Sequence, residues 1–154
     1  MRCSRSMAKS DSVYARISDQ EKKKILIVVR WPVGGIRTFL KYFLKFMPTN
    51  QLLELHMVAI ETEAILALKE EAGHRVKKWF LVETKSNRNS DLKFAAKVYN
   101  LIRSGEYDLI HAHGFTSTIV GHFSNWGLST PLVVTSHDIL KKEQFIGFFG
   151  LLKR

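Results

Sequence analysis

Residues 24–47 read KILIVVRWPVGGIRTFLKYFLKFM. The run Ile25–Val29 is apolar and largely β-branched, which is typical of a strand buried on both faces of a parallel sheet. Pro32 cannot continue a central strand, and Gly34-Gly35 permits a tight turn. Apolar side chains then recur at three- and four-residue spacing over Ile36–Met47, which predicts a helix. This order of strand, glycine turn and helix indicates an α/β, Rossmann-like domain.

Strand and helix patterns continue to alternate along the rest of the chain. The further predicted strands are Leu53–Ile60, Arg75–Val82, Tyr107–Ala112 and Leu132–Ser136, and the further predicted helices are Thr62–Ala72, Asp91–Ser104, Phe115–Trp126 and Ile139–Leu152, with a polar loop at Thr84–Ser90. Strands separated by helices form βαβ units, whose right-handed crossovers place helices on both faces of a parallel sheet. We expect one doubly wound domain with the strand order 3-2-1-4-5.

The composition is that of a globular protein with a strongly basic charge. The chain has 154 residues and a formal net charge of +10, which favours polyanions or anionic membrane surfaces as partners. A solvated lysine surface without such a partner is the alternative. Its only cysteine is Cys3, so no internal disulfide can form. We expect residues 1–22 to be a disordered basic leader and residues 23–154 to be the domain. With neither a signal-peptide pattern nor a membrane-spanning run, we expect a cytoplasmic protein, with peripheral contact to the inner face of the membrane as an extension of this hypothesis.

Three short segments with functional side chains follow the first, fourth and fifth predicted strands. Ligands of such sheets bind at the carboxyl ends of the strands, so the three segments should meet. Gly34-Gly35 allows close backbone approach, with free N–H groups at the start of the helix facing an anion that Arg37 can also reach. The fuller G-x-G-x-x-G pattern is absent, and a plain strand-to-helix turn is the alternative.

The second and third segments contribute histidines. Strand alternation places His111 and His113 on the same side of the sheet. We expect His111 to pack in the core with its ring hydrogen-bonded, and His113 to contact a ligand. A metal pair completed by Asp138 is an alternative, but no further ligand is evident and we predict no metal site. In the third segment, Thr135-Ser136-His137-Asp138, we expect Asp138 to cap the next helix and His137 to act in the site.

The helix Ile36–Met47 is both aromatic and basic. Arg37, Lys41 and Lys45 stand four residues apart on a face beside its aromatic residues. Such a helix can lie against an anionic membrane. The alternative is a sheet-packing helix with a solvated basic face. Nucleic-acid binding would rest on net charge alone, since no recognised motif is present, and we expect none.

Taken together, these segments resemble a known family. Gly34-Gly35 after the first strand, Gly73-His74-Arg75-Val76, the segment Tyr107–Gly114 and the segment Pro131–Asp138 look like the N-terminal domain of retaining glycosyltransferases of the two-Rossmann-domain (GT-B) type, family 4 or group 1. The resemblance covers Lys24–Leu140. It implies transfer of a sugar, hexosyltransferase-type, from a nucleotide sugar to an acceptor hydroxyl with retention.

The resemblance also implies roles for individual residues. Gly34 and Gly35 would approach the donor diphosphate, and His137 would lie near the donor sugar and take part in catalysis. His113 and Gly114 would shape the substrate cleft. Ser136, in the segment that carries His137, is expected in the same cleft. No cofactor is implied, because the nucleotide sugar is a substrate.

This sequence departs from the family pattern at its C-terminal end. The family's donor-binding domain, with its basic pair and its motif of two Glu residues separated by seven others, has no counterpart before Arg154. Glu63 and Glu71 have that spacing, but they lie in a predicted helix and are interpreted as solvated charges. We expect an acceptor-side fragment that is inactive alone and needs a separate donor-domain partner, with the apolar tail Phe145–Leu152 facing the missing half. A non-catalytic α/β module that engages a partner protein or a membrane is the alternative hypothesis.

Overall fold

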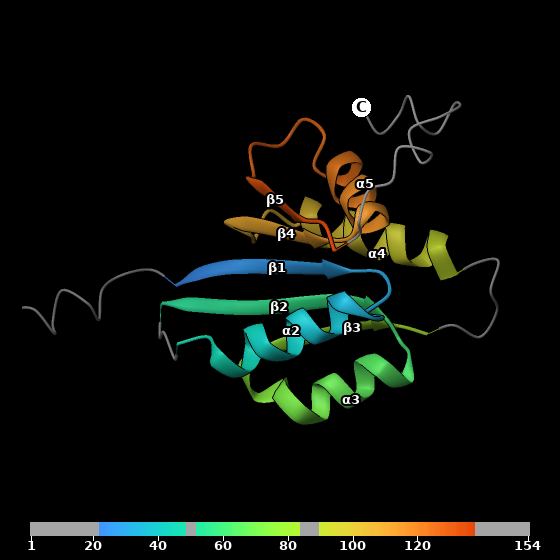
Figure 1. Ribbon diagram of the computed structural model, residues 1–154. Helices are drawn as coiled ribbons and strands as arrows, with labels where there is room; N and C mark the ends of the chain where they lie inside the picture. The colour runs from blue at the N-terminus through green and yellow to red at the C-terminus, as the bar shows by residue number, and fades with distance from the viewer. Residues whose placement is uncertain (1–21, 49–51, 84–89, 138–154) are drawn as a thin grey trace, which may run out of the picture.

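The computed structural model describes residues 22–48, 52–83 and 90–137. Its strands form one parallel sheet in the order β3-β2-β1-β4-β5, which confirms the predicted order (Figure 1). The strands are β1 (Lys23–Val29), β2 (Leu53–Ile60), β3 (Lys78–Val82), β4 (Leu109–His113) and β5 (Leu132–Thr135).

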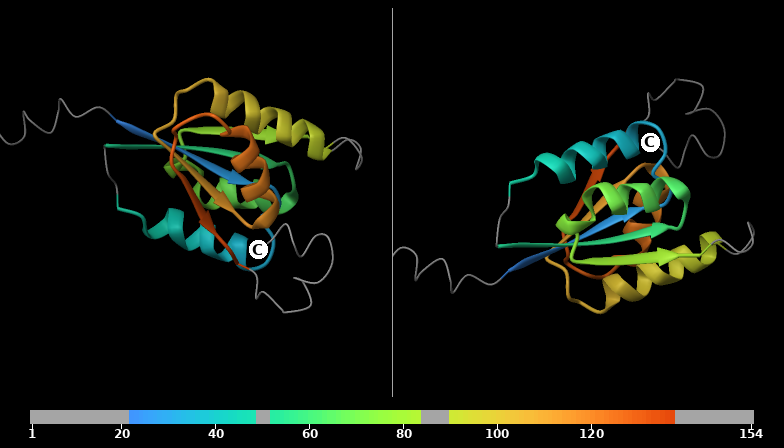
Figure 2. Two further views of the ribbon diagram at one scale, coloured as in Figure 1. Left: turned by 90° about the horizontal axis from the view of Figure 1, so that it is seen from above. Right: turned by 90° about the horizontal axis from the view of Figure 1, so that it is seen from below.

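Helices cover both faces of this sheet, as a doubly wound fold requires. They are α2 (Gly35–Phe46), α3 (Glu63–Ala72), α4 (Ser90–Arg103) and α5 (Phe115–Ser124), with a short 3-10 turn at Gly73–Arg75. Helices α2 and α3 lie on one face of the sheet, and α4 and α5 lie on the other. Figure 2, which shows the molecule from above and from below, makes this arrangement visible. The predicted architecture is therefore confirmed.

The hydrophobic core consists of two layers, one on each face of the sheet, and β1 contributes side chains to both. Leu26 and Val28 pack into the layer beneath α4 and α5, whereas Ile27 and Val29 pack into the layer beneath α2 and α3. All four side chains are fully buried. Burying each such side chain contributes about 1.5–3 kcal/mol relative to leaving it exposed. This two-sided burial explains why the first strand is apolar without alternation.

The third strand begins later than predicted, at Lys78 rather than at Arg75. Helix α3 ends at Ala72, as expected, but Gly73 keeps a right-handed conformation with φ −61°. The chain therefore continues into the 3-10 turn, where the Val76 N–H donates to the Gly73 carbonyl over 3.1 Å. A left-handed glycine would have ended the helix directly, whereas this turn delays strand pairing by three residues.

The other boundaries differ by one to a few residues. The fourth strand extends to His113, and the fifth ends at Thr135, so Ser136 and His137 follow it. Helix α5 ends at Ser124 rather than at Trp126. The leader up to residue 21, the polar loop 84–89 and the last helix, together with the tail within it, lie outside the described residues. Within the described part of the chain, no helix has the length and apolar character needed to cross a membrane.

Candidate functional site

The carboxyl ends of β1, β4 and β5 bring the three predicted segments together. Strand register pairs Val29 with His113 and His113 with Thr135, so the three strands end side by side. A Cβ atom built on Gly35 would lie 3.8 Å from the Cβ of His137, which places the start of α2 against the end of β5. The predicted meeting of these segments is present in the fold.

Two glycines at this edge have backbone conformations that other residues rarely adopt. Gly34 has φ +53° and ψ −127°, and Gly114 has φ +79° and ψ 163°. Gly114 is also confined, because an added Cβ would stand 3.2 Å from Ile36 Cδ1. Gly35 already belongs to the helix and would tolerate a Cβ at ordinary contact distance. The requirement for glycine is therefore strongest at Gly34 and Gly114.

At the start of α2 the Ile36 N–H donates to the Val33 carbonyl over 3.2 Å, whereas the N–H groups of Gly35 and Arg37 have no acceptor among the described residues. Gly34 is its N-cap residue and offers no side-chain hydrogen bond, and the first turn contains no acidic residue. Within the described residues, the Thr38 N–H and hydroxyl both bond the Gly34 carbonyl, at 3.2 and 3.3 Å. Arg37 stands in this first turn, and its charge helps to lower the pKa of Glu71 on α3, after the larger effect of Lys41. A positive helix end with an arginine beside it suits an anion.

Three histidine rings form a contiguous cluster beneath α2. The ring centroids of His111 and His113 are 4.1 Å apart, which confirms that both point to the same side. His113 Nδ1 lies 3.1 Å from His137 Nε2, within hydrogen-bond distance. The Phe39 ring packs against both His113 and His137, at centroid distances of 5.4 and 5.1 Å. The histidines of the second and third segments are thus in direct contact.

Burial of the two β4 histidines is the reverse of the expectation. His113 is the core side chain, with 1% of its surface exposed, whereas His111 is half-buried. His111 is hydrogen-bonded as expected, through Nε2 to Thr135 Oγ1 at 2.8 Å. Proximity to the strand end suggested that His113 would be the more open of the two. Phe39 and His137, which come from other elements, cover it instead.

This environment keeps both β4 histidines neutral at neutral pH. Burial, followed by the nearby His111 and His137 rings, lowers the pKa of His113 to about 3. Burial, followed by His137, also lowers the pKa of His111. Desolvation disfavours the charged imidazolium in both cases. His111 and His113 therefore act as neutral hydrogen-bonding rings.

A pocket of 560 Å³ opens beside this cluster, at the ends of β1 and β2. Its lining residues are Arg30, Trp31, Val33, Ile60, Thr62, Ser90 and Asp91. Arg30 Nε donates to Asp91 Oδ1 over 2.8 Å, with a second contact from Nη2 to Oδ2. The Arg30 guanidinium lies 4.9 Å from the centre of the Trp31 ring, and Trp31 is 51% exposed. Exposed aromatic surface and fixed polar groups thus stand side by side.

Sequence reasoning missed this pocket. A smaller hollow of 190 Å³ continues it toward the histidines and is lined by Arg30, Trp31, Val33, Ile36, His113, Gly114, Phe115, Thr116 and Ser117. The available signal was the position of Arg30-Trp31 directly after the first strand. Pairing with Asp91, across 61 residues of sequence, was not readable from any local pattern.

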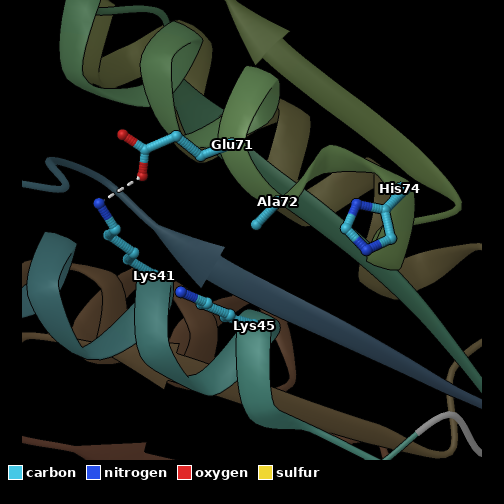
Figure 3. Close-up of a pocket in the computed structure, with 5 residues that line it drawn as sticks. All are labelled: Lys41, Lys45, Glu71, Ala72 and His74. Carbon is cyan, nitrogen blue, oxygen red and sulfur yellow. Dashed lines mark ion pairs between the residues drawn. The ribbon is translucent and has the colours of Figure 1, made fainter.

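A second pocket, of 450 Å³, lies between α2 and α3, away from the strand ends (Figure 3). It is lined by Lys41, Lys45, Glu71, Ala72 and His74. Lys41 Nζ lies 2.9 Å from Glu71 Oε2, and this hydrogen bond is the largest cause of the lowered pKa of Glu71. Glu63 and Glu71 both lie on α3, as predicted, but Glu71 is paired with Lys41 rather than simply solvated.

No metal centre is evident in residues 22–48, 52–83 and 90–137, where no group of three or more His, Cys, Asp or Glu side chains could hold an ion. The contact between His113 and His137 instead joins ring nitrogens directly. Asp138, proposed above as a helix cap or as a third ligand, lies outside the described residues.

Comparison with known proteins connects this geometry to a family. A search of curated sequences gave no match. The structure is similar to a UDP-N-acetylglucosamine 2-epimerase from Neisseria meningitidis (9% identity, TM-score 0.57), covering 81% of this chain and 35% of that one. It is also similar to a putative UDP-N-acetylglucosamine 2-epimerase from Listeria monocytogenes (11% identity, TM-score 0.56), covering 74% and 31%.

At these identities the likeness shows the fold alone, and the chain spans about a third of the length of these two proteins. A third similar structure is the C-terminal domain of the PF1911 hydrogenase from Pyrococcus furiosus (20% identity, TM-score 0.51), covering 75% of this chain and 92% of that one. The sequence profile described as Glycosyltransferase Family 4 matches residues 33–153. The match spans most of the chain, including the glycine turn and all three histidines of the cluster, and the chain belongs to glycosyltransferase family 4.

Proposed function

We propose that this chain is the acceptor-side domain of a retaining glycosyltransferase that uses a nucleotide-sugar donor. The observation that carries the proposal is the convergence of Gly34-Gly35, His113 and His137 at one edge of a family 4 domain. In the complete enzyme the bond from the anomeric carbon to the diphosphate breaks. The acceptor oxygen bonds that carbon on the same face, and its proton leaves with the nucleoside diphosphate.

The role of this chain in that reaction is electrostatic and positional. The N–H groups of Gly35 and Arg37, at the start of α2, would stabilise the charge that develops on the leaving diphosphate. Arg37 in the first turn would add a positive charge, and His137 would hold the donor sugar. His113, Gly114 and Ser136 would form the floor of the cleft. A separate or continuing donor domain would supply the opposite wall.

The pocket at Arg30 and Trp31 is the proposed acceptor site. Its aromatic surface suits the apolar face of a sugar ring, and the Arg30–Asp91 pair and Thr62 present groups that hydrogen-bond hydroxyls. The pocket adjoins the histidine cluster through the smaller hollow, so an acceptor bound here can reach the donor.

Complementation with a donor domain tests this proposal. The 154-residue chain is mixed with a separately expressed C-terminal domain of a family 4 enzyme, and sugar transfer and donor hydrolysis are measured for a panel of nucleotide sugars. We expect activity above that of either part alone. His137→Ala should abolish the gain, and Trp31→Ala should raise the KM for acceptor. Trp126→Ala, which removes an exposed tryptophan near the end of α5, is the matched control and should be neutral. No gain with any donor would contradict the proposal.

Peripheral membrane contact is a second candidate, which a feature of α2 favours. Tyr42 and Phe46 are stacked and exposed on this helix, with Phe46 at 70% exposure, and Lys45 Nζ stands 5.4 Å from the centre of the Phe46 ring. Aromatic rings beside lysines suit the interface of an anionic bilayer.

Co-sedimentation with vesicles tests membrane contact. We expect binding to phosphatidylserine-containing vesicles, weaker binding at high salt, and loss of binding in Lys41→Glu/Lys45→Glu. The control Lys93→Glu/Lys97→Glu makes the same charge change on α4, on the opposite face of the sheet, and should retain binding. Equal binding by both double variants, or none by the unmodified chain, would exclude contact through α2.

A further inference from the structure

We infer that His113 is a positioning residue that holds His137 in the tautomer with its proton on Nδ1. The two rings meet through His113 Nδ1 and His137 Nε2, which are 3.1 Å apart. A hydrogen bond at this contact needs one N–H and one lone pair. Either His113 donates to His137 or His137 donates to His113, and each arrangement fixes where both rings carry their protons.

The far side of the His113 ring decides between these arrangements. His113 Nε2 is buried and has no hydrogen-bond partner among the described residues. If His137 were the donor, a neutral His113 would carry its own proton on Nε2, where no described residue offers an acceptor. Leaving a buried donor unpaired is costly, and orphaned buried N–H groups are rarer than acceptors that lack a donor. With the proton on Nδ1, His113 donates to His137 and only a lone pair is left without a partner.

The choice is confined to these two arrangements because His113 is neutral. The groups packed against its ring are His111 from the same strand, Phe39 from α2 and His137 after β5. None of these is acidic, so no described group packed against the ring would stabilise an imidazolium. Burial lowers the pKa of His113 to about 3, in agreement with the packing.

The same contact determines which ring nitrogen of His137 carries its proton. Its Nε2 accepts from His113, so a neutral His137 carries its proton on Nδ1. In the described part of the chain, that atom has no hydrogen-bond partner, and the residue stands against Gly35 at the start of α2. His137 thus presents a single donor of fixed position, suited to a hydroxyl or phosphate oxygen of a ligand. Only the identification of that oxygen with a nucleotide sugar rests on the proposed function.

Nitrogen-15 NMR of the histidine rings tests the tautomer directly. Long-range proton–nitrogen correlation spectra of the 154-residue chain at pH 7 distinguish a protonated ring nitrogen from a bare one, and single histidine variants assign the rings. We expect Nδ1 to be protonated and Nε2 bare in both His113 and His137. A proton on Nε2 of His113, or on Nε2 of His137, would overturn the inference.

Variants at His113 test its positioning role. In His113→Asn the amide N–H takes the place of Nδ1–H, so His137 should keep its Nδ1 proton. In His113→Leu that donor is lost, and His137 should become a mixture of tautomers. His111→Asn is the control, since His111 bonds Thr135 rather than His137. An unchanged His137 tautomer in folded His113→Leu would overturn the role. If that variant fails to fold, the spectrum of the unmodified chain still decides the tautomer. No substrate is needed, so a failed transfer assay would not bear on this result.

Discussion

The two faces of β4 differ in chemistry although they belong to one five-residue strand. Toward α4 and α5 the strand presents Ile110 and Ala112, which are fully buried in an apolar layer. Toward α2 it presents His111 and His113, which pack among aromatic rings and bond to Thr135 and His137. The first face contributes mainly to the stability of the fold. The second face buries polar rings instead of apolar side chains. These rings contribute less to stability but can act on a ligand.

The largest expected effect comes from the apolar face. Ile110→Ala removes buried methyl groups from a packed layer and should lower the free energy of unfolding by about 2–5 kcal/mol. Urea unfolding followed by circular dichroism measures the change. Leu92→Ala, at a position on α4 that is 72% exposed, is the control and should change little. Equal losses for the two variants would mean that the buried Ile110 side chain contributes no more to stability than an exposed one.

A smaller effect is expected where β4 ends. Gly114→Ala forces a side chain into a conformation with φ +79° and places its Cβ 3.2 Å from Ile36 Cδ1. We expect a loss of about 1–3 kcal/mol in the same unfolding measurement. Gly35→Ala is the matched control, because that glycine is helical and its added Cβ meets only ordinary contacts. A Gly114→Ala variant as stable as the unmodified chain would show that the turn can relax.

The polar face should make stability depend on pH. The pKa of His113 is about 3 in the folded chain, below the ordinary histidine value of about 6.5, so the unfolded chain binds more protons between these values. Stability should therefore fall as pH falls from about 6.5 toward 3, with a slope of at most about 1.4 kcal/mol per pH unit from this group. His111, whose pKa is also lowered, acts in the same direction.

Urea unfolding across pH 4 to 7 isolates this dependence from that of ordinary carboxyl groups, which titrate mainly below about pH 4.5. In His113→Asn the slope between pH 6.5 and pH 4.5 should decrease, whatever the stability of the variant at pH 7. Lys93→Glu, remote from the cluster, should keep the slope of the unmodified chain. An identical slope in His113→Asn would mean that the buried histidine is not the source.

The smallest effect is expected at the ion pair between α2 and α3. Lys41 and Glu71 lie 2.9 Å apart, but both side chains are substantially exposed (Figure 3). Water and salt screen such pairs, so Lys41→Ala should leave the unfolding midpoint unchanged within error. A clear loss would show that the pair fixes the packing of α2, and comparison with Lys45→Ala in the same assay would reveal it.

Most of the fold could be predicted because its signals are local. The apolar run of β1 and the three- and four-residue spacing of α2 follow from burial on two faces and on one face. The strand order is the usual one of a doubly wound sheet, in which right-handed crossovers place helices on both faces. The start of β3 was wrong by three residues, because it depended on the right-handed conformation of Gly73, and sequence does not distinguish that from a left-handed helix end.

The candidate site could be predicted in its location but not in its detail. The sequence by itself determined which segments meet, since parallel strands end at one edge of a sheet. The sequence also determined that Gly34-Gly35, His113 and His137 lie there. Only the tertiary structure decided that His113 is buried and touches His137, 24 residues away, and that Arg30 pairs with Asp91 beside Trp31. The physical reason is that strand and helix periodicity act between near neighbours in the chain, whereas burial and hydrogen bonding depend on side chains that packing brings from distant elements.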